Sequence, residues 1–259
     1  MVVTADMLQT FWADQVLPYV WPFFRIAGLV MVAPVFGARL VPARVRIGLC
    51  LALTIVIAPG RGQVTVFDSA VANAFLIGHE LLIGVAMGFC LQLIFDALVI
   101  GGQTIAMSMG LGFAMLVDPQ RGVSVPVLSQ FFVILGILVF LALGGHLALI
   151  GMLADSFDVL EIGQLLSAAS IWTVVSWGSQ MFADAVRIAL PAVAALLVVN
   201  IAFGVMSRAA PTLNLFAVGF PVALLLGFVI LLLNIGLFPR LFSDLLQSSL
   251  TNAAGLLRP

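Results

Sequence analysis

The sequence contains no lysine, and its 259 residues include only one Tyr, two His and two Cys. Charged residues make up 8% of the chain, whereas a soluble domain carries about 25%. With so little charge the folded surface cannot be covered by polar groups, so most of it must face lipid or other apolar protein. The net charge is −1 and no basic run is present, which argues against a nucleic-acid partner.

The same scarcity removes most of the groups that catalysis needs. His79-Glu80 begins like the helix of a zinc protease, but the position that should hold the second His is Ile83. General acid–base chemistry would fall to isolated carboxylates, so we predict a protein without enzymatic activity, cofactor or metal ion. Cys50 and Cys90 both lie in apolar stretches, where we expect them to act as small core residues.

The chain is rich in apolar residues, which form several long stretches. Apolar residues make up 63% of the chain, and the mean hydropathy is +1.27. A membrane helix needs about 20 mostly apolar residues, and the segments that approach or exceed this length are 17–37, 45–60, 71–100, 125–153, 185–206 and 213–238. The sequence therefore predicts an all-α, multi-helix integral membrane protein. The most polar connection, 154–184, is expected to be a soluble excursion or an amphipathic surface helix.

Prolines and small residues interrupt these segments. A proline removes a backbone donor and kinks a helix, which lipid tolerates only where neighbouring protein satisfies the freed carbonyl group. Gly84 and Gly88 have the spacing that lets two helix backbones approach closely. We therefore expect kinked helices that pack against protein as well as lipid. The prolines concerned are Pro22, Pro34, Pro191 and Pro221.

Four ionisable residues lie inside apolar segments: Arg25, Glu80, Asp96 and Arg187. Such charges are costly in a membrane and are candidates for function. Glu80 and Asp96 are far enough apart to be separated by roughly 160° around a straight helix, whereas a proton or ion relay would need them aligned. The alternative is structural, with each charge paired across the helix bundle or placed near a helix end that water reaches.

A series of short blocks runs in order along nearly the whole chain. The blocks are Arg25-Ile-Ala-Gly28, Ala33-Pro-Val-Phe-Gly37, Val41-Pro42, Glu80-Leu-Leu-Ile-Gly84, Gly88-Phe89, Met109-Gly-Leu-Gly-Phe-Ala114, Asp118-Pro119, Phe140-Leu-Ala-Leu-Gly-Gly-His146, Ser156-Phe157, Gly204-Val-Met-Ser-Arg-Ala-Ala-Pro211, Asn214, Phe216 and Gly219-Phe-Pro221. Together they resemble the FliR family of the flagellar type III export gate, whose virulence-secretion counterparts belong to the same superfamily. The stretch 204–221 is the most specific and resembles the flagellar branch more closely.

Two positions depart from the family pattern. The chain has Gly144-Gly145-His146 where the family leads us to expect Asp-Gly-His, and it has Ser108 where we expect a Gln before the central Met-Gly. Both changes replace a hydrogen-bonding side chain with a smaller one. They put a polar role at these two positions in doubt, but not the resemblance itself.

The resemblance implies a non-catalytic subunit of a helical, hetero-oligomeric export gate in the bacterial inner membrane, within the flagellar basal body. The implied partners are FliP-like and FliQ-like subunits, FlhB-like and FlhA-like export proteins, and unfolded exported proteins as substrates. The implied organisation is a FliP-like part, about 1–184, followed by a FliQ-like helical hairpin, about 185–259, bent near Arg208-Pro211. Arg208 thereby joins the four charges above as a candidate for assembly or gating. The alternatives are a virulence-secretion counterpart and a secondary transporter of a small solute.

The family also implies that a central loop near 107–119 plugs the closed pore, and the residue types there suit that role. The methionines are flexible and can fill an irregular lumen, the glycines give the backbone freedom to move, and the leucine and phenylalanine offer an apolar constriction. The alternative is a Met-rich helix end buried in the core. The residues concerned are Met107, Met109, Gly110, Leu111, Gly112, Phe113 and Met115.

Overall fold

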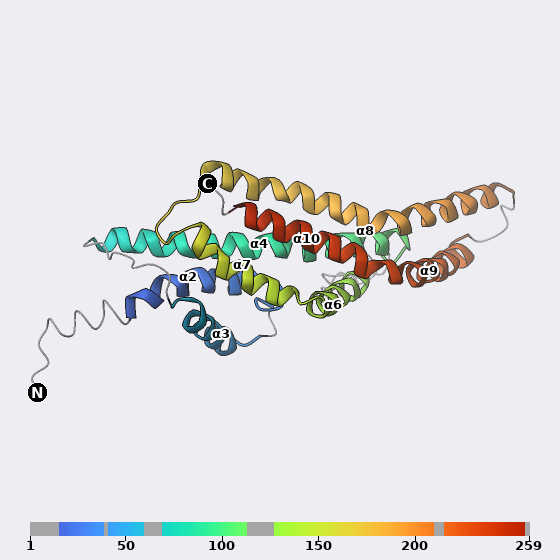
Figure 1. The fold of residues 1–259 in the computed structure, drawn as a ribbon. Coiled ribbons are helices and arrows are strands. Elements are labelled where there is room, and N and C mark those ends of the chain that lie inside the picture. Colours follow the sequence, from blue (N-terminus) through green and yellow to red (C-terminus); the bar gives the residue numbers. More distant parts are fainter. Residues whose placement is uncertain (1–15, 39–40, 60–68, 113–126, 210–214, 257–259) are drawn as a thin grey trace, which may run out of the picture. The chain divides into compact units, whose positions relative to one another are not determined.

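A computed structural model describes residues 16–38, 41–59, 69–112, 127–209 and 215–256. All regular elements within these ranges are helices (Figure 1), which confirms the prediction of an all-α membrane protein. The helices are α2 Leu17–Val32, α3 Ala43–Ile57, α4 Ala70–Ser108, α6 Val127–Ala142, α7 Gly145–Val159, α8 Ala168–Ala209, α9 Leu215–Asn234, the 3₁₀ helix η3 Ile235–Leu237, and α10 Phe238–Leu256.

The fold divides into two compact units. The first comprises Met1–Leu93, Gly144–Trp177 and Ser248–Pro259, and the second comprises Ile94–Leu143 and Gly178–Gln247. The long helices α4 and α8, and the last helix α10, each contribute residues to both units.

The apolar segments outnumber the helices that are long enough to cross a bilayer. Within the described ranges, three helical stretches qualify by length and composition, or four if α6 and α7 count as one broken span. The helices α2 and α3 have 16 and 15 residues, which is short of the roughly 20 that a bilayer needs. The six apolar segments therefore mark helices rather than bilayer crossings.

Proline explains why α2 is shorter than its apolar segment. The helix ends at Val32, and Ala33 adopts an extended conformation with ψ 137°, as expected for a residue that precedes a proline. Pro34 therefore terminates a helix. The other three prolines lie inside helices: Pro22 in α2, Pro191 in α8 and Pro221 in α9.

The polar connection is much shorter than the sequence suggested. Helix α7 continues to Val159 and α8 begins at Ala168, so most of 154–184 belongs to these two helices. Asp155 and Asp158 lie on the exposed side of α7, while Ser156 and Phe157 between them are buried. Average polarity hides such an amphipathic turn, because the apolar and polar residues cancel.

A closely packed helix pair forms the centre of the first unit. A Cβ atom built on Gly84 would overlap the backbone oxygen of Arg25, and one built on Gly28 would overlap that of Leu81. Gly88 is also close, with Ala33 N at 3.0 Å from its built Cβ. The spacing of Gly84 and Gly88 therefore serves packing of α2 against α4 within this chain.

Aromatic side chains form the centre of the second unit. The Phe95 ring lies 6.0 Å from Phe140 and 5.8 Å from Phe242, edge to face in both cases. The Ser129 hydroxyl donates a hydrogen bond to the Val99 carbonyl oxygen at 2.8 Å. These contacts join α4 to α6 and to the last helix.

Helix α10 is amphipathic and extends well beyond the last apolar segment. One face is buried, and the opposite face is exposed and largely polar. The buried residues are Phe238, Phe242, Leu245, Leu246, Ser249, Ala253 and Leu256. The exposed residues include Arg240, Asp244, Gln247, Ser248, Thr251, Ala254 and Gly255.

Candidate functional site

Arg25 and Glu80 form a buried ion pair between α2 and α4. The Arg25 Nε atom lies 2.7 Å from Glu80 Oε2, and both side chains are 0% exposed. A charge at this depth is tolerated only when an opposite charge and further hydrogen bonds accompany it. The close packing at Gly84, one helical turn after Glu80, brings the two backbones near enough for this contact.

The remaining Arg25 contacts reach the end of α7. Its Nη1 atom donates to the carbonyl oxygens of Ser156 and Leu160, each at 3.0 Å. The guanidinium carbon lies 4.3 Å from the centre of the Phe157 ring, a distance typical of a cation–π contact. Arg25 Nη2 has no hydrogen-bond partner among the described residues.

The segment 160–167, which connects α7 to α8, is held by the same cluster. The Gly163 N–H donates to Glu80 Oε1 at 3.3 Å, and the Leu166 N–H donates to His79 Nε2 at 3.0 Å. The side chains of Arg25, His79 and Glu80 thus form hydrogen bonds with the end of α7 and with the connection that follows it. The two charges are paired with each other inside the fold, and the roles of Arg25 and Glu80 in assembly or gating stay predictions.

The other candidate charges are not part of this cluster. Asp96 is half-buried on the same unbroken helix as Glu80, so the two carboxylates stay on different sides of α4. Arg187 is 65% exposed and lies 3.3 Å from Asp184, one turn earlier in α8. Arg208 is exposed in the last turn of α8. The roles of these residues in assembly or gating stay predictions.

The predicted central loop, 107–119, overlaps the last two residues of α4, which extends to Ser108, and it contains the glycine that terminates this helix. Gly110 adopts the left-handed conformation with φ +86°. Its N–H donates to the Met107 carbonyl oxygen, and the Leu111 N–H donates to the Ala106 carbonyl oxygen, both at 3.0 Å. This pair of hydrogen bonds is the Schellman motif, which satisfies the last carbonyl groups of a helix. Gly110 therefore has a defined structural role as the residue that stops α4.

The two methionines before Gly110 lie in different surroundings. Met109 is fully buried, whereas Met107 is 56% exposed. A Cβ atom built on Gly112 would overlap the Met107 sulfur, so the exposed methionine packs against the start of the loop. Phe113 and Met115, with the rest of the predicted loop to 119, lie outside the described residues.

A cavity of about 660 Å³ opens beside this end of α4. It brings together the start of the predicted loop and three residues, Gly204, Gly219 and Phe220, of the stretch that carried the most specific part of the resemblance. Ser108 lies in its wall, but the Ser108 hydroxyl donates to the Thr104 carbonyl oxygen of its own helix at 2.9 Å. The lining residues are Met107, Ser108, Met109, Gly110, Asn200, Phe203, Gly204, Gly219, Phe220 and Ala223.

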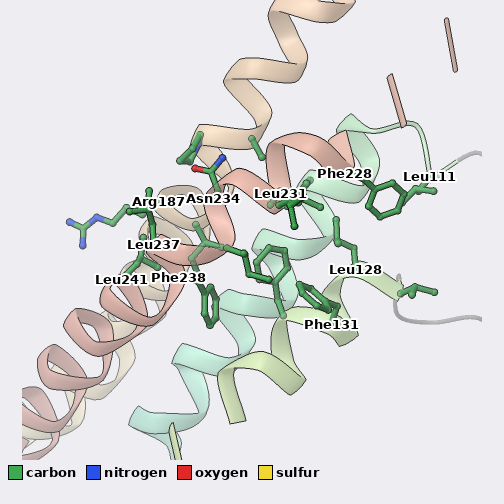
Figure 2. A pocket seen from close by; sticks show the side chains of 18 residues that line it. Leu111, Leu128, Phe131, Arg187, Phe228, Leu231, Asn234, Leu237, Phe238 and Leu241 are labelled. Carbon is green, nitrogen blue, oxygen red and sulfur yellow. The ribbon is translucent and has the colours of Figure 1, made fainter. Parts of the chain in front are cut away.

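A second cavity of about 580 Å³ lies in the same unit and is almost entirely apolar. Leu111 from the predicted loop contributes to it, together with rings from α6, α9 and α10 such as Phe131, Phe228 and Phe238. Figure 2 shows the Arg187 guanidinium pointing away from these rings. Arg187 and Asn234 are the polar residues in the lining of this cavity.

Sequence reasoning missed three residues of α8 and α9 that lie near the end of α4: Asn200, Phe203 and Gly227. Asn200 and Phe203 carry no motif, and Gly227, which contacts Met109, is one of 24 glycines. Contacts between residues so distant in sequence leave no spacing signal. The polar residue Asn200 in an otherwise apolar stretch was the one local sign that could have been used.

Known proteins are similar to this chain over most of its length. The sequence profile of "Bacterial export proteins, family 1" matches residues 16–249. The flagellar biosynthetic protein FliR of Pectobacterium carotovorum subsp. carotovorum is 39% identical over 249 residues, covering 93% of this chain and 94% of the relative. The protein of the same name from Escherichia coli (strain K12) is 37% identical and covers 83% of each chain. That of Aquifex aeolicus (strain VF5) is 33% identical, covering 87% of this chain and 88% of its own.

Proposed function

The chain belongs to the FliR family of bacterial flagellar export proteins, and from this membership we propose that it is a non-catalytic subunit of the protein-conducting export channel. It is a component of the flagellar export apparatus and a multi-pass protein of the inner membrane. The observation that carries the proposal is the family match over residues 16–249, together with relatives that are similar over most of their length. The same relatives favour the flagellar apparatus over a virulence-secretion system or a solute transporter.

We propose that FliP-like and FliQ-like subunits, with FlhB-like and FlhA-like proteins, surround this chain. The long apolar helices are largely exposed within this chain. In α8, 22% of the most apolar 18-residue stretch is buried, and in the helical stretch Gly219–Leu256 the corresponding share is 11%. Such faces need lipid or apolar protein against them. Exposed side chains that would meet these neighbours include Leu190, Leu197, Val198, Ile201, Val205, Leu225, Val229, Leu232 and Leu233.

We propose that the chain consists of a FliP-like part, about 1–184, followed by a FliQ-like helical hairpin, about 185–259. Helix α8 ends at Ala209 and α9 begins at Leu215, so helical arms flank the proposed bend near Arg208. Helix α8 itself runs through residue 185 without interruption. The proposed boundary at 184/185 therefore lies within a continuous helix.

The central stretch 107–119 is proposed as the plug of the closed channel. Its first residues lie at a cavity wall made with α8 and α9, and Met107 and Met109 supply flexible apolar groups there. Deleting residues 110–115 should leave the complex assembled but leaky to small ions. Conductance of the purified complex in planar bilayers tests this, and conductance at background would contradict the plug.

A complementation experiment tests the wider proposal. A strain that lacks its own FliR should regain export of flagellar proteins when this chain is expressed, and the chain should co-purify with FliP-like and FliQ-like proteins. Uptake of a small solute by liposomes that hold the chain alone would instead support a transporter. Absence of both co-purification and restored export would overturn the channel proposal.

A further inference from the structure

The Met109 side chain packs over Gly227 of α9. A Cβ atom built on Gly227 would lie 2.6 Å from Met109 Cε, 2.7 Å from Cγ and 2.9 Å from Sδ. The space that a side chain at position 227 would fill is therefore occupied by the methionine. This explains why Met109 is fully buried while Met107, two residues earlier, is largely exposed.

This contact lies at the last residue before the chain changes direction. The Met109 N–H still donates to the Ile105 carbonyl oxygen at 2.9 Å, and Gly110 then adopts its left-handed conformation. The hydrogen bonds of the helix end fix the backbone within α4, but they do not join α4 to another helix. Met109 supplies that connection, because its side chain reaches α9.

We propose that the packing of Met109 on Gly227 holds the end of α4 against α9 in the closed channel, which makes Gly227 a positioning residue. The inference rests on the plug proposed above, since it concerns the anchor from which the stretch beginning at Gly110 starts. A methionine suits the role because it is unbranched and gains contact along a smooth backbone surface. Glycine suits it because any Cβ would take the same space.

The contact predicts a specific response to substitution. In Gly227→Ala the new methyl group meets only the Met109 side chain among its three nearest atoms. A flexible side chain gives way more easily than a backbone, so the methionine should be displaced while α9 keeps its course. Met109→Ala removes the same contact from the other side. The two single variants should therefore share one defect.

The experiment measures ion conductance of the whole complex, purified with its partners, in planar bilayers. Gly227→Ala and Met109→Ala should each raise basal conductance several-fold, with co-purification unchanged. The double variant should conduct no more than either single variant, because both substitutions break one contact. Gly178→Ala in α8, where a built Cβ meets nothing within 4 Å, is the matched control and should conduct at background.

Two results would overturn the inference. Background conductance in both single variants would mean that the contact does not hold the closed state. Conductances that add in the double variant would mean that the two residues act separately. If Gly227→Ala fails to assemble, Met109→Ala decides the question alone, since it introduces no new group.

The deletion of 110–115 separates this inference from the plug proposal. If the deletion leaks and the single variants do not, only the anchor is wrong. If the deletion itself stays at background, the plug is wrong as well.

Discussion

The Arg25 guanidinium and the Glu80 carboxylate meet at 2.7 Å with neither side chain exposed, although 55 residues separate them in the sequence. The pair satisfies two charges that would each be prohibitive alone in an apolar protein. Because Arg25 and Glu80 also hold the connection after α7, their contribution is expected in folding and assembly rather than in proton transfer.

Glu80→Gln tests this structural role. The variant leaves Arg25 buried with an uncompensated charge, which costs about 3–5 kcal/mol when one partner of a buried pair is removed. We expect less folded protein in the membrane and less co-purified complex. Replacing both partners with apolar residues, as in Arg25→Met with Glu80→Leu, should recover much of the loss. A Glu80→Gln variant that assembles normally but does not export would contradict the structural role.

Gly84→Ala tests the close approach of α2 and α4. The added Cβ would overlap the backbone oxygen of Arg25, and backbone cannot move aside cheaply, so we expect a loss of about 1–3 kcal/mol or more. Thermal stability of the purified protein measures the effect. Gly78→Ala in the same helix, where a built Cβ meets nothing within 4 Å, should be neutral or stabilising. Equal stability of the two variants would refute the packing argument.

Gly110→Ala tests the termination of α4. A Cβ in the left-handed region costs about 1 kcal/mol, and Gly110 has φ +86°. Asn tolerates this conformation better than Ala does, so Gly110→Asn should be the milder variant when melting temperatures are compared. Indistinguishable melting temperatures would show that the observed backbone conformation is not required.

Cysteine labelling tests the environment of α10. Polar side chains cannot face lipid without cost, so the exposed face of α10 should border water or a polar partner. In a variant that lacks Cys50 and Cys90, which are buried and free, Ala254→Cys should react with a membrane-impermeant maleimide. The neighbouring Ala253 is fully buried, and Ala253→Cys should react far more slowly. Equal rates would contradict the assigned faces.

The sequence was sufficient for the fold class, because composition and the length of apolar runs depend on every residue at once. It was insufficient for the helix bounds where polarity is periodic, as in Asp155 and Asp158 on α7 or Asp244 on α10. Averaging over a window removes that periodicity, although the positions of the apolar residues in α10 carry it. The identity of the family rested on short blocks that no physical pattern would have singled out.

The sequence identified the candidate residues, but it did not predict which of them contact one another. Arg25 and Glu80 stood out as charges in apolar segments, but their pairing required the fold. Met109 stood out in a Met-rich stretch, while its position on Gly227 depends on how α4 and α9 pack. Pairings between distant segments are set by the global packing of helices, which local sequence does not encode.

The length of α4 has a consequence for how the protein meets its membrane. Its 39 residues correspond to about 58 Å of helix, nearly twice the roughly 30 Å of a hydrocarbon layer. Even a strong tilt cannot bring the whole of such a helix within the acyl chains. Part of α4 therefore resides beyond the lipid tails, and hydrophobic matching to bilayer thickness has little influence on its placement. Lipids with longer or shorter acyl chains should accordingly change the placement of α4 only slightly.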